Sequence, residues 1–539
     1  MPELGRSYTL VWLRAFYRLR SWTRRKPRLL KLGAATVVGA VLLAPSIWML
    51  SVIPPLWRDH DAYVQVTFPP GTMTILHYGP LYCFVARIPL YLGYAIDCLR
   101  AGAPFPTPGF FLQPILTDSG VFLLLLSQHV ALCYSAFYLI ALTNHLFLVR
   151  LVLAVVWAAD PLFYTFAHCV GSEALSTILL LLVGAAGLSI IRHPRSVPRK
   201  EWLLFGVLLW LCIMTRHINA LLAALLPLAF LLLSAQRLTM IPFTRSQILG
   251  RWRRLRARQD LQKATLAVAV GISCIALANI SLRGLCHAVH TPYSSRVGVI
   301  FLWRLQFLAK LPAETRNQLL DKVAGNTAFP DVKKVISRLR EAVALRAKSP
   351  GTGGTSLPDV VTDPALAPVL NRTAQAFLYP PDKIFLGAVA TDFTRSRETT
   401  IPKVVDYLFQ STTFYFVAPG LAPGEAPLST FRDKSAGQIA AIFWKHSYLH
   451  RWKSFSYNAF LLFWFANLSL LTVLAKVRKE EAAAVVSYAT ALTLVGLVMM
   501  LANCLLSEFL PRYTLPMWEL TIVSVSVLFG KTVERKCLT

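Results

Sequence analysis

Residues 32–63 of the chain read LGAATVVGAVLLAPSIWMLSVIPPLWRDHDAY. The part up to Ile53 is almost entirely apolar, and an α-helix of about 20 such residues spans the ~30 Å hydrocarbon core of a bilayer. Arg58, Asp59 and Asp61 follow within a few residues. Ionisable groups at a membrane boundary are costly to desolvate and commonly serve a function. The stretch therefore predicts a membrane-spanning helix that delivers a charged group of side chains to one membrane surface.

The composition indicates several such spans. The chain has 539 residues, of which 55% are hydrophobic and 15% charged, and its mean hydropathy is +0.53. Soluble proteins carry roughly 25% charged residues. We therefore predict an all-α polytopic membrane protein with about ten transmembrane helices. The expected spans are 33–53, 119–142, 147–164, 172–191, 202–215, 218–234, 264–282, 456–475, 483–505 and 514–530.

The formal net charge of +29 is carried mainly by short loops between apolar runs. Such basic loops mark the cytoplasmic side of a membrane, so nucleic acid is not the expected partner. If the basic N-terminus is cytoplasmic, ten crossings place loops 192–201 and 235–263 and the C-terminal tail inside as well. This count requires that the apolar segment 81–97 is a helix in the outer interface, which does not cross.

This topology divides the chain into four parts. They are a cytoplasmic basic N-terminus (1–32), a membrane domain (33–282) whose first outer loop (54–118) carries the candidate active site, a mainly helical extracytoplasmic insert (283–455), and C-terminal membrane helices with a short cytoplasmic tail (456–539). Within the insert, 297–308 and 312–345 have helical periodicity, whereas 404–419 could be a strand or an interfacial helix.

Asp59 and Asp61 form the acidic pair of the first outer loop. Residues two apart in an extended segment project to the same side, so both carboxylates could act on one site. They could bind a divalent cation through oxygen ligands, or one of them could act as general base on an acceptor hydroxyl. The alternative is a solvated loop in which aspartate and histidine are ordinary residues.

Other polar residues fall on the same predicted side of the membrane. His77 and Tyr82 flank a Gly-Pro turn, and Glu173 opens the fourth span. Arg216 and Arg512 stand where spans break or begin. Each has an ordinary explanation, as a helix start, a carboxylate at a helix N-terminus, or an arginine that reaches water. Together on one face, they suit a site that takes a phosphate-bearing lipid from the bilayer, because arginine binds phosphate through two hydrogen bonds.

Five short motifs, in this order along the chain, resemble those of the GT-C superfamily of membrane glycosyltransferases, which use polyprenyl-phosphate sugars and include mannosyltransferases. The acidic motif Asp59–Tyr63 is similar to that of the family's first outer loop, and His77–Tyr82 to the turn that follows. Ser172–Leu175 resembles the glutamate-led start of a later span. Thr215-Arg216, followed here by histidine instead of the usual proline, resembles the end of the next span. Arg512-Tyr513 is similar to the Arg-Tyr before the last span.

The resemblance implies transfer of a sugar from a polyprenyl-phosphate donor to a glycan, lipid or protein acceptor on the outer face, with inversion at the sugar. One first-loop aspartate, Asp59 or Asp61, would be the base, and arginine would stabilise the charge of the leaving lipid phosphate. Some relatives bind a divalent metal, Mg²⁺ or Mn²⁺, and the two aspartates would allow this without requiring it. The residues expected to bind the lipid phosphate or the sugar are Arg58, His77, Tyr82, Glu173, Arg216, Arg512 and Tyr513.

Two other classes of function stay open at this stage. An O-antigen-ligase-like or polymerase-like envelope enzyme would use side chains of the insert, such as Arg338, Arg340 or His446. A multi-pass transporter or flippase would carry ionisable residues near the midplane and inverted repeats. Asp160 is the clearest acid near a span, and no repeat is visible. We expect a bacterial inner (plasma) membrane location with both termini cytoplasmic, since the insert has one plausible sequon and the sequence has no retention signal.

Overall fold

The structure of the chain is a computed structural model. The residues that it describes are 27–57, 60–71, 79–105, 107–193, 196–239, 247–291, 293, 296–348, 369–417, 436–446, 465–466, 469, 480–507 and 509–536. The predicted span 456–475 therefore lies almost entirely outside the described residues. So do Arg58, Asp59 and His77, whereas Asp61 is described in its backbone alone.

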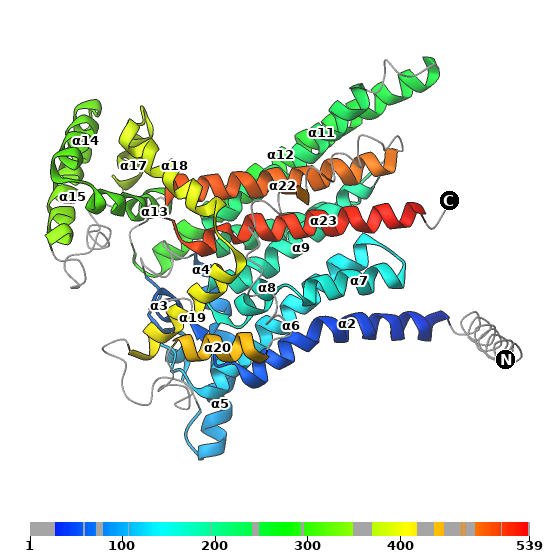
Figure 1. The fold of residues 1–539 in the computed structure, drawn as a ribbon, viewed down its shortest axis with the longest axis horizontal. Coiled ribbons are helices and arrows are strands. Elements are labelled where there is room, and N and C mark those ends of the chain that lie inside the picture. The colour runs from blue at the N-terminus through cyan, green and yellow to red at the C-terminus, as the bar shows by residue number, and fades with distance from the viewer. Residues whose placement is uncertain are drawn as a thin grey trace, which may run out of the picture.

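Long apolar helices form a bundle in which they run roughly side by side (Figure 1). They bury one large apolar core to which α2, α6, α9, α11, α22 and α23 all contribute. Their bounds are α2 (Pro27–Val52), α6 (Asp118–Thr143), α9 (Ser172–Arg192), α10 (Arg199–Thr215), α11 (Leu225–Thr239), α12 (Gln247–Ala288), α22 (Glu480–Leu506) and α23 (Leu515–Lys536).

The prediction of an all-α polytopic membrane protein is confirmed. Among the described residues, eight helices are long and apolar enough to cross a membrane, and a bent helix pair would make a ninth. All of the eight except Pro80–Ala101 coincide with spans expected from the sequence. The predicted span 202–215 is the helix α10, which has 17 residues, so it is slightly short of the roughly 20 that a span needs.

The span expected at 147–164 is not one continuous helix. It consists of α7 (Phe147–Ala158) and α8 (Pro161–Ala167), which are bent by 65° relative to each other. The break follows from two residues. Pro161 has no backbone N–H to continue α7, and the carboxylate of Asp160 accepts a hydrogen bond from the N–H of Leu162 at 2.9 Å, which caps the new helix.

The segment expected as an interfacial helix, 81–97, comprises α4 (Pro80–Val85) and α5 (Arg87–Ala101). Its length and composition would allow it to cross a membrane. However, α5 runs across the direction of α2 and α23 rather than along it (Figure 1). Arg87 is buried, and its guanidinium donates hydrogen bonds to the backbone carbonyls of Phe68 and of Phe111, the last residue of the 3-10 helix η2 (Pro108–Phe111). Its position in the membrane interface stays a prediction.

One short parallel pairing ties the loop after α2 to the bundle. Strand β1 (Leu56–Trp57) pairs with β2 (Cys169–Val170), with Leu56 opposite Cys169 and Trp57 opposite Val170. His168 reinforces the pairing, because its Nε2 lies 2.9 Å from the carbonyl oxygen of Ile53. Parallel strands leave a pairing in the same direction. The chain after Trp57 and the chain after Val170 therefore start side by side at the same end of the bundle.

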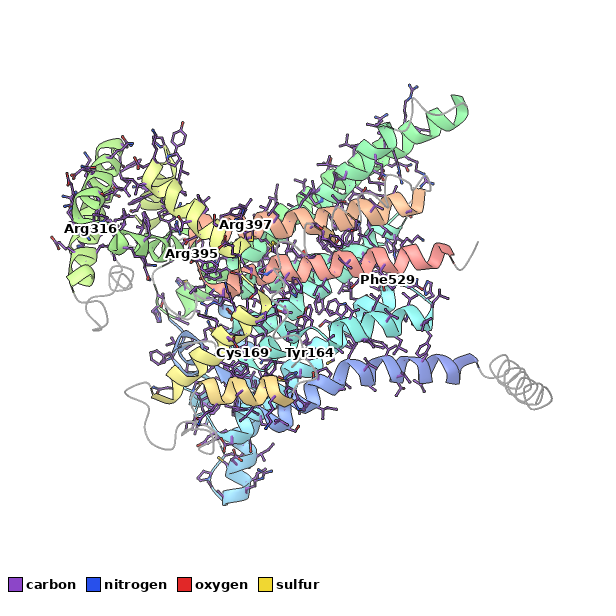
Figure 2. The ribbon with its side chains drawn as sticks, in the orientation of Figure 1. Tyr164, Cys169, Arg316, Arg395, Arg397 and Phe529 are labelled. Carbon is purple, nitrogen blue, oxygen red and sulfur yellow. The ribbon has the colours of Figure 1, made fainter. Side chains whose placement is uncertain are left out.

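The insert has its own apolar core, formed mainly by residues 301–385. Figure 1 shows α14 and α15 standing apart from the bundle, and Figure 2 places Arg316 there, whereas Tyr164 and Cys169 lie within the bundle. The helices expected at 297–308 and 312–345 are confirmed, the second being interrupted at 327–329. The insert helices are α13 (Arg296–Arg304), η4 (Leu305–Lys310), α14 (Ala313–Asn326), α15 (Pro330–Lys348), α17 (Leu370–Leu378) and α18 (Lys383–Arg397).

A buried arginine of the insert, which is ion-paired within the insert, also connects the insert to the bundle. The guanidinium of Arg304 pairs with the carboxylate of Asp392, and it also donates to the carbonyl of Ser507 at 3.4 Å, beyond the end of α22. The segment expected to be a strand or an interfacial helix at 404–419 is the helix α19 (Ile401–Val417). It packs with α20 (Ala436–His446) on the core of the bundle.

The substitution Gly93→Ala tests the packing of α5 against α6. A Cβ at Gly93 would lie 2.2 Å from the backbone nitrogen of Gly120, so one of the two helices must move. Overpacking of this kind typically costs about 1–3 kcal/mol, and we expect a lower melting temperature of the purified full chain in detergent. The control is Gly39→Ala in α2, where nothing lies within 4 Å of the added Cβ. Equal melting temperatures of the two variants would contradict this packing.

Candidate functional site

Glu173 is a buried carboxylate to which two arginines converge. It lies in the first turn of α9, and its side chain is 1% exposed. Its Oε1 lies 3.2 Å from Nη1 of Arg216 and 3.5 Å from Nε of Arg512. A carboxylate also interacts favourably with the N-terminal end of a helix dipole. Three predicted site residues, far apart in the sequence, thus meet in one cluster.

Arg216 reaches this cluster because the chain breaks after α10. The helix ends at Thr215, Arg216 is extended (φ −148, ψ 133), and the 3-10 helix η3 (His217–Ala224) follows. The amide of Asn219 donates to the carbonyl of Cys212 and to the hydroxyl of Ser176, each at 2.9 Å. These two bonds satisfy the end of α10 and hold the break against α9. The sequence-based interruption of the apolar run at Arg216 is confirmed.

Arg512 lies in a short 3-10 helix, η7 (Pro511–Thr514), directly before α23. Its Nη1 donates to the hydroxyl of Tyr407 at 3.2 Å, and its Cζ lies 5.6 Å from the centroid of the Tyr513 ring. The Tyr513 hydroxyl in turn accepts a hydrogen bond from Ser507 at 3.2 Å. The guanidinium is therefore held between a carboxylate and two aromatic rings, an arrangement that orients it firmly.

Tyr82, expected to bind substrate, lies behind this cluster. Its side chain is 2% exposed, and its hydroxyl accepts a hydrogen bond from the N–H of Gly171 at 2.9 Å and donates to Oε1 of Gln128 at 3.1 Å. The amide of Gln128 donates to the carbonyls of Ala167 and Cys169. This network fixes the turn that leads into Glu173. Tyr82 therefore serves to position that turn, and the structure does not place its hydroxyl where substrate could reach it.

The Gly-Pro turn of the first loop packs directly on the break that carries Arg216. Gly79 has a φ of +92, and a Cβ there would lie 2.4 Å from the carbonyl oxygen of Thr215. Only glycine adopts this backbone conformation easily and permits so close an approach. The turn between the expected site residues His77 and Tyr82 is thus in contact with the end of α10, although His77 itself lies outside the described residues.

The acidic motif is described only in part. Asp59 lies outside the described residues, whereas Asp61 is in the first turn of a helix, so the expectation of an extended segment is wrong at this residue. Trp57 precedes the motif and pairs with Val170, three residues before Glu173. Paired strands lie about 4.8 Å apart. The helix α3 (His60–Thr67) begins directly after the motif's first aspartate and contacts α4 and α19. We predict that Asp59 and Asp61 face the Glu173 cluster. The pairing of Trp57 with Val170 and the contacts of α3 support this prediction.

Two residues of the cluster were missed in the sequence. Tyr407 belongs to α19, whose contact with η7 depends on tertiary packing. Glu519 is a buried carboxylate inside α23 that accepts a hydrogen bond from the hydroxyl of Thr177 and interacts electrostatically with Arg216. A lone glutamate in an apolar span was a signal that could have been used, because intramembrane acids are rare and commonly functional. Asp160 has a structural role instead. Its carboxylate accepts a hydrogen bond from Nε1 of Trp518 at 2.7 Å and caps the N-terminus of α8.

The described residues do not offer a metal site. They contain no group of three or more His, Cys, Asp or Glu side chains arranged to hold a metal ion. Glu173 is a poor ligand for a cation because two guanidinium groups already neutralise it and would repel a metal. A divalent cation at this end of the bundle would therefore depend on Asp59 and Asp61, which lie outside the described side chains.

No protein-family model and no curated protein matches the chain. Among solved structures, the oligosaccharyltransferase AglB from Archaeoglobus fulgidus, in complex with an inhibitory peptide and a dolichol-phosphate, has a TM-score of 0.40 and 10% identity, over 95% of this chain and 51% of that one. The apo form of the Archaeoglobus fulgidus oligosaccharyltransferase has a TM-score of 0.39 and 12% identity, over 94% of this chain and 51% of that one. ArnT from Cupriavidus metallidurans in the apo state has a TM-score of 0.27 and 13% identity, over 94% of this chain and 78% of that one.

The chain spans about half the length (51%) of the two oligosaccharyltransferase chains that it matches. At TM-scores of 0.27–0.40 the helix arrangements overlap only in part. The function is therefore proposed below from the geometry of this chain.

The substitution Glu173→Gln removes the carboxylate to which both arginines are paired. Breaking a buried ion pair by removing one partner typically costs about 3–5 kcal/mol, and we expect the lower end because Arg216 is partly exposed. The melting temperature of the full chain in detergent measures the loss. The matched control is Asp321→Asn, which breaks the exposed pair with Arg340 and should cost less than about 1 kcal/mol. Equally small losses in both variants would contradict the cluster.

Proposed function

We propose that this chain is a membrane glycosyltransferase of the GT-C type, which transfers a sugar from a polyprenyl-phosphate donor to an acceptor hydroxyl on the outer face of the membrane. The observation that carries the proposal is the convergence of Arg216 and Arg512 on buried Glu173, next to the pairing that leads into the acidic first loop. Such a cluster combines fixed positive charge with adjacent carboxylates. These are the two requirements for expelling a phosphate and activating a hydroxyl.

The arginines would hold the phosphate of the donor. A guanidinium carries five N–H donors in a rigid fork, so bonding to Glu173 at one edge fixes the direction of the others. The side chain of Arg216 is 15% exposed, whereas that of Arg512 is almost fully buried. Arg216 would therefore contact the phosphate first, and Arg512 would contribute its charge from beneath. Both act where negative charge develops as the phosphate leaves.

The transfer step follows from these positions. The acceptor hydroxyl gives its proton to the carboxylate of Asp59 or Asp61 as its oxygen forms a bond to the anomeric carbon of the sugar. The bond from that carbon to the phosphate oxygen breaks, and its electron pair leaves with the polyprenyl phosphate. Attack from the face opposite the phosphate inverts the anomeric centre. A divalent cation held by Asp59 and Asp61 would supply additional positive charge to the phosphate.

The proposal includes the surroundings of the site. The donor reaches it from the bilayer, and the acceptor, a glycan, lipid or protein, comes from the outer face, where we also place the insert. The charge distribution of the loops supports this orientation, with the N- and C-termini in the cytoplasm and the protein in a bacterial inner membrane.

The substitutions Asp59→Asn and Asp61→Asn test the base. In the full chain reconstituted in vesicles with a polyprenyl-phosphate sugar and an envelope extract as acceptor source, release of polyprenyl phosphate counts every transfer. We expect one single variant and the double variant to lose at least about 10²-fold in rate, the usual contribution of a general base. Asp97→Asn is the control in the same segment. The Asp97 carboxylate accepts a hydrogen bond from the hydroxyl of Ser119, with 2.6 Å between the two oxygens, and does not belong to the cluster. Full activity of the double variant would overturn the proposal.

The substitution Arg512→Gln tests stabilisation of the leaving phosphate. Removing one preorganised donor to developing charge commonly lowers kcat by about 10²–10³, and we expect this loss with little change in KM. Arg512→Lys keeps the positive charge but loses the planar set of N–H donors, so its kcat should lie between those of Arg512→Gln and the unmodified chain. Arg395→Gln, at an exposed arginine of the insert, is the control. A kcat equal to that of the unmodified chain for Arg512→Gln would rule out this role.

A further inference from the structure

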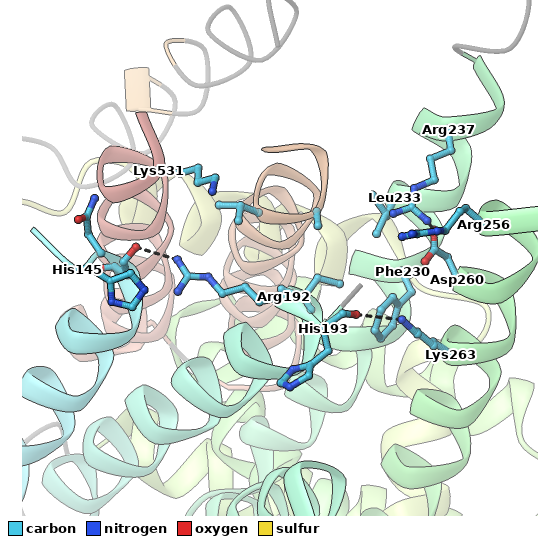
Figure 3. A pocket seen from close by; sticks show the side chains of 15 residues that line it. His145, Arg192, His193, Phe230, Leu233, Arg237, Arg256, Asp260, Lys263 and Lys531 are labelled. Carbon is cyan, nitrogen blue, oxygen red and sulfur yellow. Dashed lines mark hydrogen bonds and ion pairs between the residues drawn. The ribbon is translucent and has the colours of Figure 1, made fainter. Parts of the chain in front are cut away.

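A second polar cavity lies at the other end of the same helices (Figure 3). It has a volume of about 310 Å³ and lies between the ends of α6, α9, α11, α22 and α23 and the adjacent part of α12. The helix α9 carries Glu173 in its first turn and Arg192 at its last residue. Since its 21 residues rise about 1.5 Å each, the cavity is roughly 30 Å from the Glu173 cluster. It is therefore separate from the proposed active site.

The cavity is strongly basic. Among the described residues, its walls include Arg192, Arg237, Arg256, Lys263 and Lys531, against one carboxylate, that of Asp260. That carboxylate is already paired with Arg237, at 2.5 Å. Positive charge collected in a concave, partly enclosed space attracts an anion more strongly than the same charges spread over a surface.

Hydrogen bonds within the protein fix these basic groups in advance. Nζ of Lys263 donates to the carbonyl of His193 at 3.2 Å (Figure 3) and lies 5.8 Å from the centroid of the Phe230 ring. A lysine ammonium has three donors, so this bond leaves others to point into the cavity. Arg192 donates to the last carbonyls of α6, at Leu142 and Thr143. The walls are thus ordered before any ligand arrives.

We propose that this cavity binds the phosphate group of an anionic membrane lipid. The preference of basic loops for the cytoplasmic side explains why these residues lie at one end of the bundle, but not why they enclose a cavity. Apolar side chains, among them Ile191, Phe230 and Leu233, form the rest of the lining. They suit the glycerol and upper acyl part of a lipid better than free phosphate. Basic pockets between membrane helices are known to take such headgroups.

The test compares three probes on the purified full chain in non-ionic detergent. They are dioctanoyl phosphatidylglycerol, dioctanoyl phosphatidylcholine and inorganic phosphate, each titrated while the melting temperature is followed. We expect a saturable rise with phosphatidylglycerol alone. In Lys263→Gln and Lys531→Gln the apparent Kd for phosphatidylglycerol should increase roughly fivefold each, as expected for one basic residue near a lipid surface. Lys200→Gln is the matched control, because Lys200 is an exposed residue at the start of α10 that does not line the cavity.

Three outcomes would overturn the proposal. Equal shifts with phosphatidylcholine and phosphatidylglycerol would show that the headgroup charge is not recognised. A shift with inorganic phosphate at the same concentrations would assign the cavity to a soluble anion instead of a lipid. An unchanged Kd in the Lys263→Gln/Lys531→Gln double variant would place lipid binding elsewhere. Because these measurements need no sugar transfer, they stand apart from the test of the proposed function.

Discussion

The charge of Glu173 is the constraint around which this end of the bundle is built. A carboxylate at 1% exposure must be compensated, because an unpaired buried charge costs several kcal/mol. The compensation comes from two other spans. Arg216 requires that α10 stop at Thr215, and Arg512 requires the short helix η7 before α23. The breaks in these spans are therefore the means by which three distant segments deliver charged side chains to one place.

The segment between α2 and α6 is attached to this place by three contacts of different kinds. The β1–β2 pairing sets Trp57 beside Val170, the hydroxyl of Tyr82 holds the N–H of Gly171, and Gly79 packs on Thr215. All three lie within a few residues of either the acidic motif or the arginine–glutamate cluster. The two halves of the proposed chemistry, proton acceptance and phosphate stabilisation, are thereby brought to the same end of the bundle.

Most of the fold could be predicted from the sequence, because apolar runs of the right length give membrane helices whatever their neighbours are. The bend at Asp160-Pro161 was missed, since hydropathy alone does not register a proline that starts a new helix. Counting basic loops was enough to place Glu173, Arg216 and Arg512 on one side. It could not show that Arg512 also meets Tyr407 or that Tyr82 is buried, because both depend on how α19 and α4 pack.

The two ends of α9 now have different proposed roles, a reactive cluster at Glu173 and a lipid-phosphate cavity at Arg192. The most direct test of the central claim is an experimental structure of the full chain with polyprenyl phosphate bound. The expected result is a phosphate within about 4 Å of the guanidinium groups of Arg216 and Arg512, the distance of an ion pair. A phosphate bound at saturating lipid only in the cavity lined by Lys263, or contacting neither arginine, would contradict it.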